Sequence, residues 1–449
     1  MDEIRILTPT GMLGYGFPIE DFKEGIRRKP HVITVDSGST DSGPQKLGNG
    51  SLTCTYEAYY KDISILLEAS YEHKVPVYIS SAGGAGSNEQ VDIFVDIVKK
   101  ISKEKKYNFK IAVIYSDIDK DLIKNKLKQQ KISPCGPVQM LTEEEIDDAT
   151  TIVAQMGVEP FLKAIDEDVD IIISGRAYDP VPIAALGVKN GFDLGLCWHL
   201  GKIMECGALC AGAALKPIMG YLRRDHFIVE PMSSDLKCTE ASVAAHTLYE
   251  KSHPYLLPGP GGILDVSEAV FQQYDDRSVK VTNSKFIPSK EYTIKLEGAK
   301  SVGYRATFIA GMRDPFAIKQ IDSILEGVRK NVSEYFSEYL GKFDIIFHVY
   351  GKNGVMGDYE PEKNTASHEL CIVVEVVAND QQIANAICSK ARVTLLHYHF
   401  EGRKATGGNV GFIFTPLEIP LGEVYQFNVY HLMVIDDGTQ YFPVSIMEI

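Results

Sequence analysis

The chain lacks three features that would each assign it to a class of protein. Its eight cysteines are scattered and contain no Cys-x-x-Cys pair, so the sequence predicts neither a disulfide framework nor a cysteine zinc site. It has no run of about 18 apolar residues, which a membrane-spanning helix would need. No basic or apolar leader precedes the first strand-like segment. These absences predict a soluble cytoplasmic protein whose cysteines are mostly buried thiols.

The chain also lacks an excess of positive charge. Its formal net charge is -14, and lysine and arginine are nowhere dense enough to neutralise a row of phosphates. We therefore expect neither a nucleic-acid partner nor an anionic-membrane surface. At 449 residues, 45% of them hydrophobic, the chain has a globular composition and exceeds the length of one typical core. Two or more domains are expected.

The first 190 residues repeat one pattern of three parts. A short β-branched run is followed by a turn of small polar residues and then by a longer amphipathic segment. Near-continuous apolar runs are typical of strands that are buried on both faces. The pattern predicts an α/β fold with a doubly wound, mainly parallel sheet that is Rossmann-like. The predicted strands are residues 4–7, 32–35, 75–79, 111–115 and 169–173.

A second pattern runs from about residue 300 to residue 435. Strand-like and helix-like segments alternate there in the order βαββαβ, which is the ferredoxin-like arrangement. We predict three regions: a Rossmann-like domain over residues 1–215, a connecting region over 216–300 packed on the site, and an α+β ferredoxin-like domain over 301–449.

Five small, polar loops follow the predicted N-terminal strands. In an open parallel sheet, the carboxyl ends of the strands lie at one edge, and ligands bind in the crevice that their loops form. Convergence of all five loops therefore predicts a ligand site at that edge. The loops are residues 8–11, 36–41, 80–86, 116–119 and 174–179.

Carboxylates in two of these loops are candidate catalytic groups. Asp36 and Asp41 lie in the second loop and Asp117 lies in the fourth. Crowded carboxylates bind a hard cation or raise one pKa until that group acts as a general base, so the residues leave a divalent cation open. Turn formation and helix capping are the structural alternatives. Hydroxyl groups of the same loops are predicted to contact substrate, and these belong to Thr10, Ser37, Ser39 and Thr40.

The loop that contains Gly83, Gly84 and Gly86 opens a predicted helix. Free amide groups at a helix start bind a phosphate or a carboxylate. The loop is neither a Walker loop nor a Gly-x-Gly-x-x-Gly motif, so the expected anion belongs to the substrate or to coenzyme A rather than to NAD or ATP. A plain tight turn is the alternative.

Arg176, Tyr178 and Asp179 follow the fifth strand. An arginine at a strand end can hold a carboxylate through two parallel hydrogen bonds. Asp179 stands directly before Pro180 and is expected to cap the next helix more than to act in catalysis.

The segment 196–211 is predicted to be a helix that carries His199, Glu205 and Cys206. His199 and Cys206 are separated by two turns, or roughly 10 Å of rise, so they cannot form a nucleophile and base pair. Cys206 is therefore expected to be a buried thiol. Glu205 and His199 remain candidate acid or base groups.

Several segments together resemble the acyclic terpene utilisation AtuA family. They are residues 7–11, 35–41, 80–86, 174–179, 199–208 and 258–262. The resemblance implies carbon–carbon lyase chemistry on a branched ester like 3-hydroxy-3-methylglutaryl-CoA, with release of acetate during terpenoid breakdown. It also implies a ferredoxin-like C-terminal domain. It assigns no catalytic residue and no metal.

The sequence thus predicts a lyase or hydro-lyase that acts on a branched hydroxy acid or its coenzyme A thioester. Asp36 would be the base or a cation ligand, Arg176 would hold a carboxylate, and Glu205 would be the second acid or base group. One alternative is a non-catalytic ligand-binding or assembly subunit of an acyl-CoA-processing complex, because ferredoxin-like modules commonly pair through their sheets. Another is a hydrolase that uses Cys206. The expected partners are a small-molecule substrate and further copies of the chain.

Overall fold

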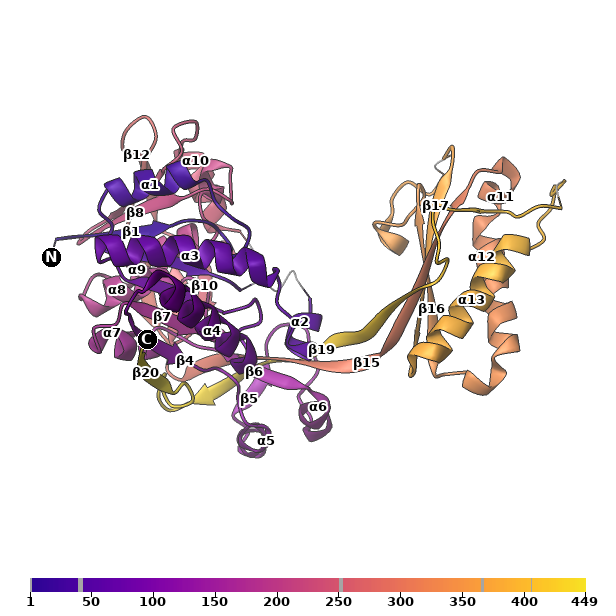
Figure 1. Ribbon diagram of the computed structural model, residues 1–449, viewed down its shortest axis with the longest axis horizontal. Helices are drawn as coiled ribbons and strands as arrows, with labels where there is room; N and C mark the ends of the chain where they lie inside the picture. Colours follow the sequence, from indigo (N-terminus) through magenta and orange to yellow (C-terminus); the bar gives the residue numbers. More distant parts are fainter. Residues whose placement is uncertain (1, 39–42, 250–252, 365–366, 405) are drawn as a thin grey trace. The chain divides into compact units, whose positions relative to one another are not determined.

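The computed structural model describes residues 2–38, 43–249, 253–364, 367–404 and 406–449. The chain forms two compact units, which are shown in Figure 1. Unit 1 comprises residues 1–300 and 427–449, and unit 2 comprises residues 301–426. Both units combine helices with sheets, which confirms the predicted mixed α/β class.

Unit 1 is built on a ten-stranded sheet whose centre is parallel. The five predicted N-terminal strands lie side by side there, and each pairs in parallel with its neighbours. Their side chains are almost all buried, as strands covered on both faces require. In sheet order they are β1 (Glu3–Thr8), β2 (Val32–Asp36), β3 (Val77–Ser80), β7 (Ile171–Ser174) and β4 (Lys110–Ile114).

Both edges of this sheet are antiparallel, so the sheet is mixed rather than mainly parallel. Residues 216–300 are not only a connection, because four of their strands extend the sheet beyond β1. The last strand of the chain pairs with β4 and closes the other edge, which is why residues 427–449 belong to unit 1. The added strands are β8 (Ile218–Arg223), β9 (Phe227–Pro231), β13 (Val279–Thr282), β12 (Val270–Gln273) and β20 (Val444–Glu448).

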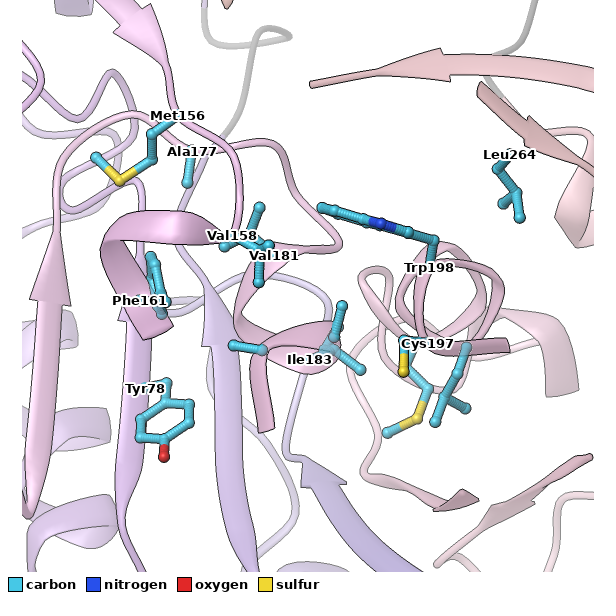
Figure 2. Close-up of a cluster of buried hydrophobic side chains, with 14 of the residues drawn as sticks. Tyr78, Met156, Val158, Phe161, Ala177, Val181, Ile183, Cys197, Trp198 and Leu264 are labelled. Carbon is cyan, nitrogen blue, oxygen red and sulfur yellow. The ribbon is translucent and has the colours of Figure 1, made fainter. Parts of the chain in front are cut away.

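Helices cover the two faces of the parallel strands. On β7, Ile171 and Ile173 point into one hydrophobic cluster and Ile172 points into the other, as strand alternation requires. One cluster includes α1 (Ile19–Arg27), α3 (Tyr56–His73) and α4 (Asn88–Lys105). The other includes α7 (Glu159–Asp166), α8 (Val181–Lys189) and α9 (Leu194–Met204), and Figure 2 shows part of it.

Shorter elements complete unit 1. A three-stranded sheet contains β10 (Leu256–Gly259), β11 (Gly262–Asp265) and β14 (Lys285–Pro288). The other elements are α2 (Gln45–Asn49), α5 (Lys120–Lys128), β5 (Ile132–Pro134), α6 (Glu143–Asp148), β6 (Thr151–Gln155), η1 (Leu209–Ala211) and α10 (Glu240–Thr247).

Unit 2 has the order of elements that the sequence predicted. Its strands lie in the order β16, β17, β15 and β19, and a buried core joins them to the helices. The ferredoxin-like and Rossmann-like assignments stay predictions. The elements are β15 (Tyr292–Met312), α11 (Pro315–Lys319), α12 (Ile321–Tyr335), η2 (Ser337–Tyr339), β16 (Phe343–Tyr350), η3 (Gly357–Tyr359), β17 (Leu370–Ala378), α13 (Gln381–His397), β18 (Gly411–Phe412) and β19 (Ile419–Ile435).

The long strands β15 and β19 carry the chain from one unit to the other. Residues 295–299 of β15 pair with β6 in unit 1, whereas residues 304–312 pair with β17 in unit 2. In β19, residues 431–433 pair with β5. None of the helices formed by the described residues has the length and apolar character needed to cross a membrane.

Replacement of Phe161 by alanine tests the core of unit 1. Phe161 on α7 is fully buried, and its ring lies 6.4 Å from the ring of Tyr78 on β3 (Figure 2). We expect Phe161→Ala to lower the free energy of unfolding by about 3–5 kcal/mol, because it leaves a cavity. Urea unfolding followed by fluorescence of Trp198, the single tryptophan of the chain, measures the change. Met140→Ala, at a side chain that is 61% exposed, is the control and should change little.

Candidate functional site

A cavity of about 300 Å³ opens at the carboxyl ends of the parallel strands of unit 1. Its lining comes from the loops after β1, β2 and β7, from the end of α9 and the segment that follows it, and from the residue Tyr249 after α10. We call it the first cavity, and its lining residues are Gly11, Met12, Tyr15, Asp36, Gly38, Arg176, Asp179, Glu205, Cys206, Leu209, Ala214, Leu215 and Tyr249.

A second cavity of about 530 Å³ shares Arg176, Asp179 and Glu205 with the first. The two cavities therefore meet at these three side chains. All of its lining lies in unit 1. The remaining lining residues are Cys135, Gln155, Tyr178, Lys202, Pro258, Gly259, Pro260, Thr293, Lys295, Tyr430 and Leu432.

Asp36, at the end of β2, is the buried carboxylate of the first cavity. Ser80 donates a hydrogen bond to its Oδ1 at 2.5 Å, and the amide of Gly38 donates to its Oδ2 at 2.8 Å. Burial raises the pKa of Asp36, and repulsion from Asp179 raises it further. These effects outweigh the hydrogen bonds and the charge of Arg176, so the pKa is about 7. Asp36 can therefore take up and release a proton near neutral pH.

Arg176, in the loop after β7, is the buried cation that both cavities share. Its Nε donates to Glu297 on β15 at 2.8 Å, and its Nη1 donates to Asp179 at 3.2 Å. Burial disfavours the charged guanidinium, but Glu297 and Asp179 together hold the pKa of Arg176 above its usual value. Burial alone would raise the pKa of Glu297, but the charges of Arg176 and Lys295 lower it to about 2. The pair is therefore ionised at neutral pH.

Glu205 at the end of α9 forms an ion pair with Lys202 one turn earlier. Both side chains are almost completely buried, and both line the second cavity. A buried charge needs a partner of opposite sign because water cannot solvate it. The pair therefore adds two paired charges to the cavity that Arg176 and Asp179 also line.

Two glycines bring the end of α9 against the loop after β1. A Cβ on Gly11 would lie 2.7 Å from the carbonyl carbon of Cys206, and a Cβ on Gly207 would lie 2.7 Å from the Gly11 nitrogen. No side chain fits at such distances. This close approach brings Glu205 and Cys206 to the first cavity, although they are far from β1 in the sequence.

Within the loop of Gly83, Gly84 and Gly86, hydrogen bonds already engage the amides of Gly84, Ala85 and Gly86, which favours the structural alternative over anion binding. Gln90 is fully buried, and its Oε1 accepts hydrogen bonds from the amides of Ala85 and Gly86 at 3.0 and 2.9 Å. Ser81 and Ala82 accept from the amides of Gly84 and Gly86. The glycines line neither cavity. Their loop is a tight turn, which was the structural alternative.

His199 does not reach either cavity. Thr247 donates its hydroxyl proton to a backbone carbonyl, so it accepts from His199 Nε2 at 2.9 Å, and Nδ1 is left to accept from Ser284 at 2.6 Å. Burial lowers the pKa of His199 to about 3. The imidazole is therefore a neutral packing group, and its assignment as a catalytic residue is corrected.

Asp117 also lies away from both cavities. Its Oδ1 accepts the amide of Asn88 at the start of α4, while Asn88 accepts the amides of Ser116 and Asp117. Burial raises the pKa of Asp117 to about 6, but the carboxylate serves the end of a helix. The capping alternative holds for this residue.

The other predicted site residues differ in whether they line a cavity. Asp179 does not cap α8, whose N-cap is Pro180 without a side-chain bond, and instead faces both cavities. Tyr178 lines the second cavity. Thr10 and Ser37 are buried and line neither cavity, and Ser37 donates to Tyr59. Ser39, Thr40 and Asp41 lie outside the described residues, so their roles stay predictions.

Sequence reasoning missed Lys295 and Glu297 as site residues. Lys295 and Glu297 alternate with Ile294 and Leu296 along β15, which in sequence is typical of a strand with one solvated face. Nothing in that pattern signals a buried ion pair. Among the described residues, no group of three or more His, Cys, Asp or Glu is arranged to hold a metal ion.

Comparison with family models gives a match over most of the chain. The model described as "Acyclic terpene utilisation family protein AtuA" matches residues 45–410. The chain belongs to the AtuA family. The matched region includes Arg176, Asp179, Glu205 and Glu297, so most of the site lies within the part that defines the family, whereas Asp36 precedes it. Comparison with curated proteins and with solved structures gave no match.

Replacement of Gln90 tests the structural role of the glycine loop. We expect Gln90→Leu to lower the free energy of unfolding by about 1–3 kcal/mol, because the amide of Ala85 loses its acceptor and the carbonyl of Ser51 loses its donor. Urea unfolding measures the loss. Gln129→Leu, at an exposed position, is the matched control. If Gln90→Leu is as stable as the wild type, Gln90 does not hold the loop amides, and they become candidates for anion binding again.

Replacement of Asp36 tests its raised pKa without any substrate. The pKa of this carboxyl is about 7 in the folded chain against 3.8 without the protein environment, so folding binds a proton, and stability falls as pH rises from 5 to 8. The shift corresponds to a loss on the order of 2–3 kcal/mol. Asp36→Asn removes this contribution, so the stability of the variant relative to the wild type should rise over the same interval. Urea unfolding at pH 5 and pH 8 measures it, and equal slopes would refute the raised pKa.

Proposed function

We propose that this AtuA-family chain is a lyase that acts on a hydroxylated acid or on its coenzyme A thioester. One observation carries the proposal: the buried carboxyl of Asp36, whose pKa is about 7, faces the same cavity as Arg176. A general base works best when its pKa lies near the working pH. An arginine beside it suits a carboxylate or an oxygen that becomes negative.

In a carbon–carbon cleavage, Asp36 takes the proton of the substrate hydroxyl. The electron pair of the O–H bond forms a carbonyl, the adjacent C–C bond breaks, and its electrons form an enolate. Arg176 stabilises the enolate oxygen, and the Lys202–Glu205 pair returns a proton to carbon. Both proton transfers use groups that line the cavities.

In the related elimination of water, Asp36 takes a proton from carbon instead. The electron pair of the C–H bond forms a double bond. The hydroxyl leaves as water after it takes a proton from a donor near Glu205. Both reactions therefore need a base at Asp36 and a proton donor near Glu205. The family description, which refers to the use of acyclic terpenes, fits the breakdown of branched carbon chains.

The first cavity suits lyase chemistry better than hydrolysis by a thiol. Cys206 lines the cavity, but none of its described lining residues is a histidine. A cysteine hydrolase needs a base within hydrogen-bond reach of the sulfur, and His199 is held elsewhere by Ser284 and Thr247. The alternative that depends on Cys206 is therefore the weaker one.

Turnover by two variants tests the assignment. A panel of branched 3-hydroxy acids and their coenzyme A esters is assayed for cleavage and dehydration products. We expect Asp36→Asn to lower kcat by about 100- to 10,000-fold, because the base is lost. Arg176→Met should lower kcat/KM by about 100-fold or more, because the substrate is no longer oriented.

Asp117→Asn is the matched control, because it removes another carboxyl with a raised pKa, which is partly buried and lies outside the cavities. Folding of each variant is checked by Trp198 fluorescence. Full turnover by folded Asp36→Asn and Arg176→Met proteins would contradict the proposal. Tight binding of acyl-CoA esters by a wild-type protein that never turns them over would favour the non-catalytic ligand-binding subunit.

A further inference from the structure

The charged groups are divided unequally between the two cavities. The first cavity is lined by three carboxylates, Asp36, Asp179 and Glu205, and by one cation, Arg176. The second is lined by three cations and by only two of these carboxylates, since Lys202 and Lys295 are added and Asp36 is absent. A negative group of a ligand is therefore favoured in the second cavity, and a group that gives up a proton is favoured in the first.

Lys295, like Lys202, lines the second cavity and not the first. Its side chain is only 17% exposed, and its Nζ lies 2.7 Å from Glu297 Oε1 and 5.0 Å from the centre of the Tyr430 ring. Glu297 is shared with Arg176, so one carboxylate serves two buried cations. The contact with Glu297 is an ion pair, and an ammonium group has three N–H donors with which it can also bind the oxygens of a ligand.

We propose that the second cavity is an anion subsite in which Lys295 and Arg176 bind a carboxylate or phosphate group of the ligand. The inference rests on the proposed function in that the same ligand presents its reacting carbon to Asp36 in the first cavity. It extends that function by requiring an anionic group apart from the reacting hydroxyl. Substrates that have only one polar end would leave this subsite empty.

The cavity volume favours this role over a purely structural ion pair. A buried pair that serves only stability is packed by neighbouring side chains, whereas Lys295 lines a space of about 530 Å³. Gln155 and Thr293 line the same space and add neutral polar groups. Such a mixture of cations and neutral polar groups suits oxygen atoms of an acid.

The single tryptophan allows binding to be measured without turnover. Tyr178 lines the second cavity, and its ring centre lies 5.7 Å from that of the buried Trp198. The wild-type chain is titrated with succinate and, separately, with inorganic phosphate, while chloride holds the ionic strength constant. We expect a saturable fluorescence change with at least one of them. The tighter ligand identifies the group as a carboxylate or a phosphate.

Variants then locate the binding. Lys295→Gln should weaken it by about tenfold or more, because a charge-assisted contact is lost, while Lys295→Arg should retain it. Lys300→Gln is the control, since Lys300 pairs with Glu145 and Asp148 and lines neither cavity. If Lys295→Gln does not fold, Thr293→Phe decides, because it fills the cavity without changing any charge and should also abolish binding.

The proposal is overturned if neither anion gives a saturable change, if chloride has the same effect, or if Lys295→Gln or Thr293→Phe binds as tightly as the wild type. Asp36→Asn separates the two proposals, because it should bind the anion nearly as well as the wild type. Normal anion binding together with full turnover by Asp36→Asn would refute the proposed base and leave the subsite standing.

Discussion

The buried guanidinium of Arg176 is the constraint on which the site depends. Its side chain is 4% exposed, so its charge must be balanced by protein groups rather than by water. Glu297 on β15 and Asp179 in the same loop supply that balance, and Asp36 on β2 lies within the influence of the same charge. Because Arg176 lines both cavities, its charge affects the ionisation of the acidic groups that line each of them.

The glycines of the neighbouring loops make room for this arginine. A Cβ on Gly38 would lie 2.7 Å from Arg176 Nη1, and a Cβ on Gly86 would lie 2.3 Å from the Arg176 backbone nitrogen. Gly86 also has a φ of 69°, which disfavours any other residue. The glycine-rich sequence that is typical of an anion cradle therefore serves packing here.

The five N-terminal strands could be predicted from the sequence, because a strand that is buried on both faces is a nearly continuous run of apolar residues. Each of the five N-terminal strands is a short β-branched run, and each is found where periodicity placed it. The strand at the far edge of the ten-stranded sheet, β12, gives no comparable signal. Antiparallel edge strands such as β12 have exposed residues in most positions, so their apolar pattern is weak, and only pairing with distant strands defines them.

The sequence alone determined that polar loops follow parallel strands, and this identified Asp36 and Arg176 as residues of one site, whereas Glu205 was predicted from the helical segment that carries it. It could not determine which side chains face a cavity. Gln90 captures the amides of the glycine loop, Ser284 and Thr247 hold His199, and Glu297 reaches Arg176 from 121 positions along the chain. The tertiary structure decided these outcomes, because a buried polar group takes the partner that packing places beside it, whatever its distance in sequence.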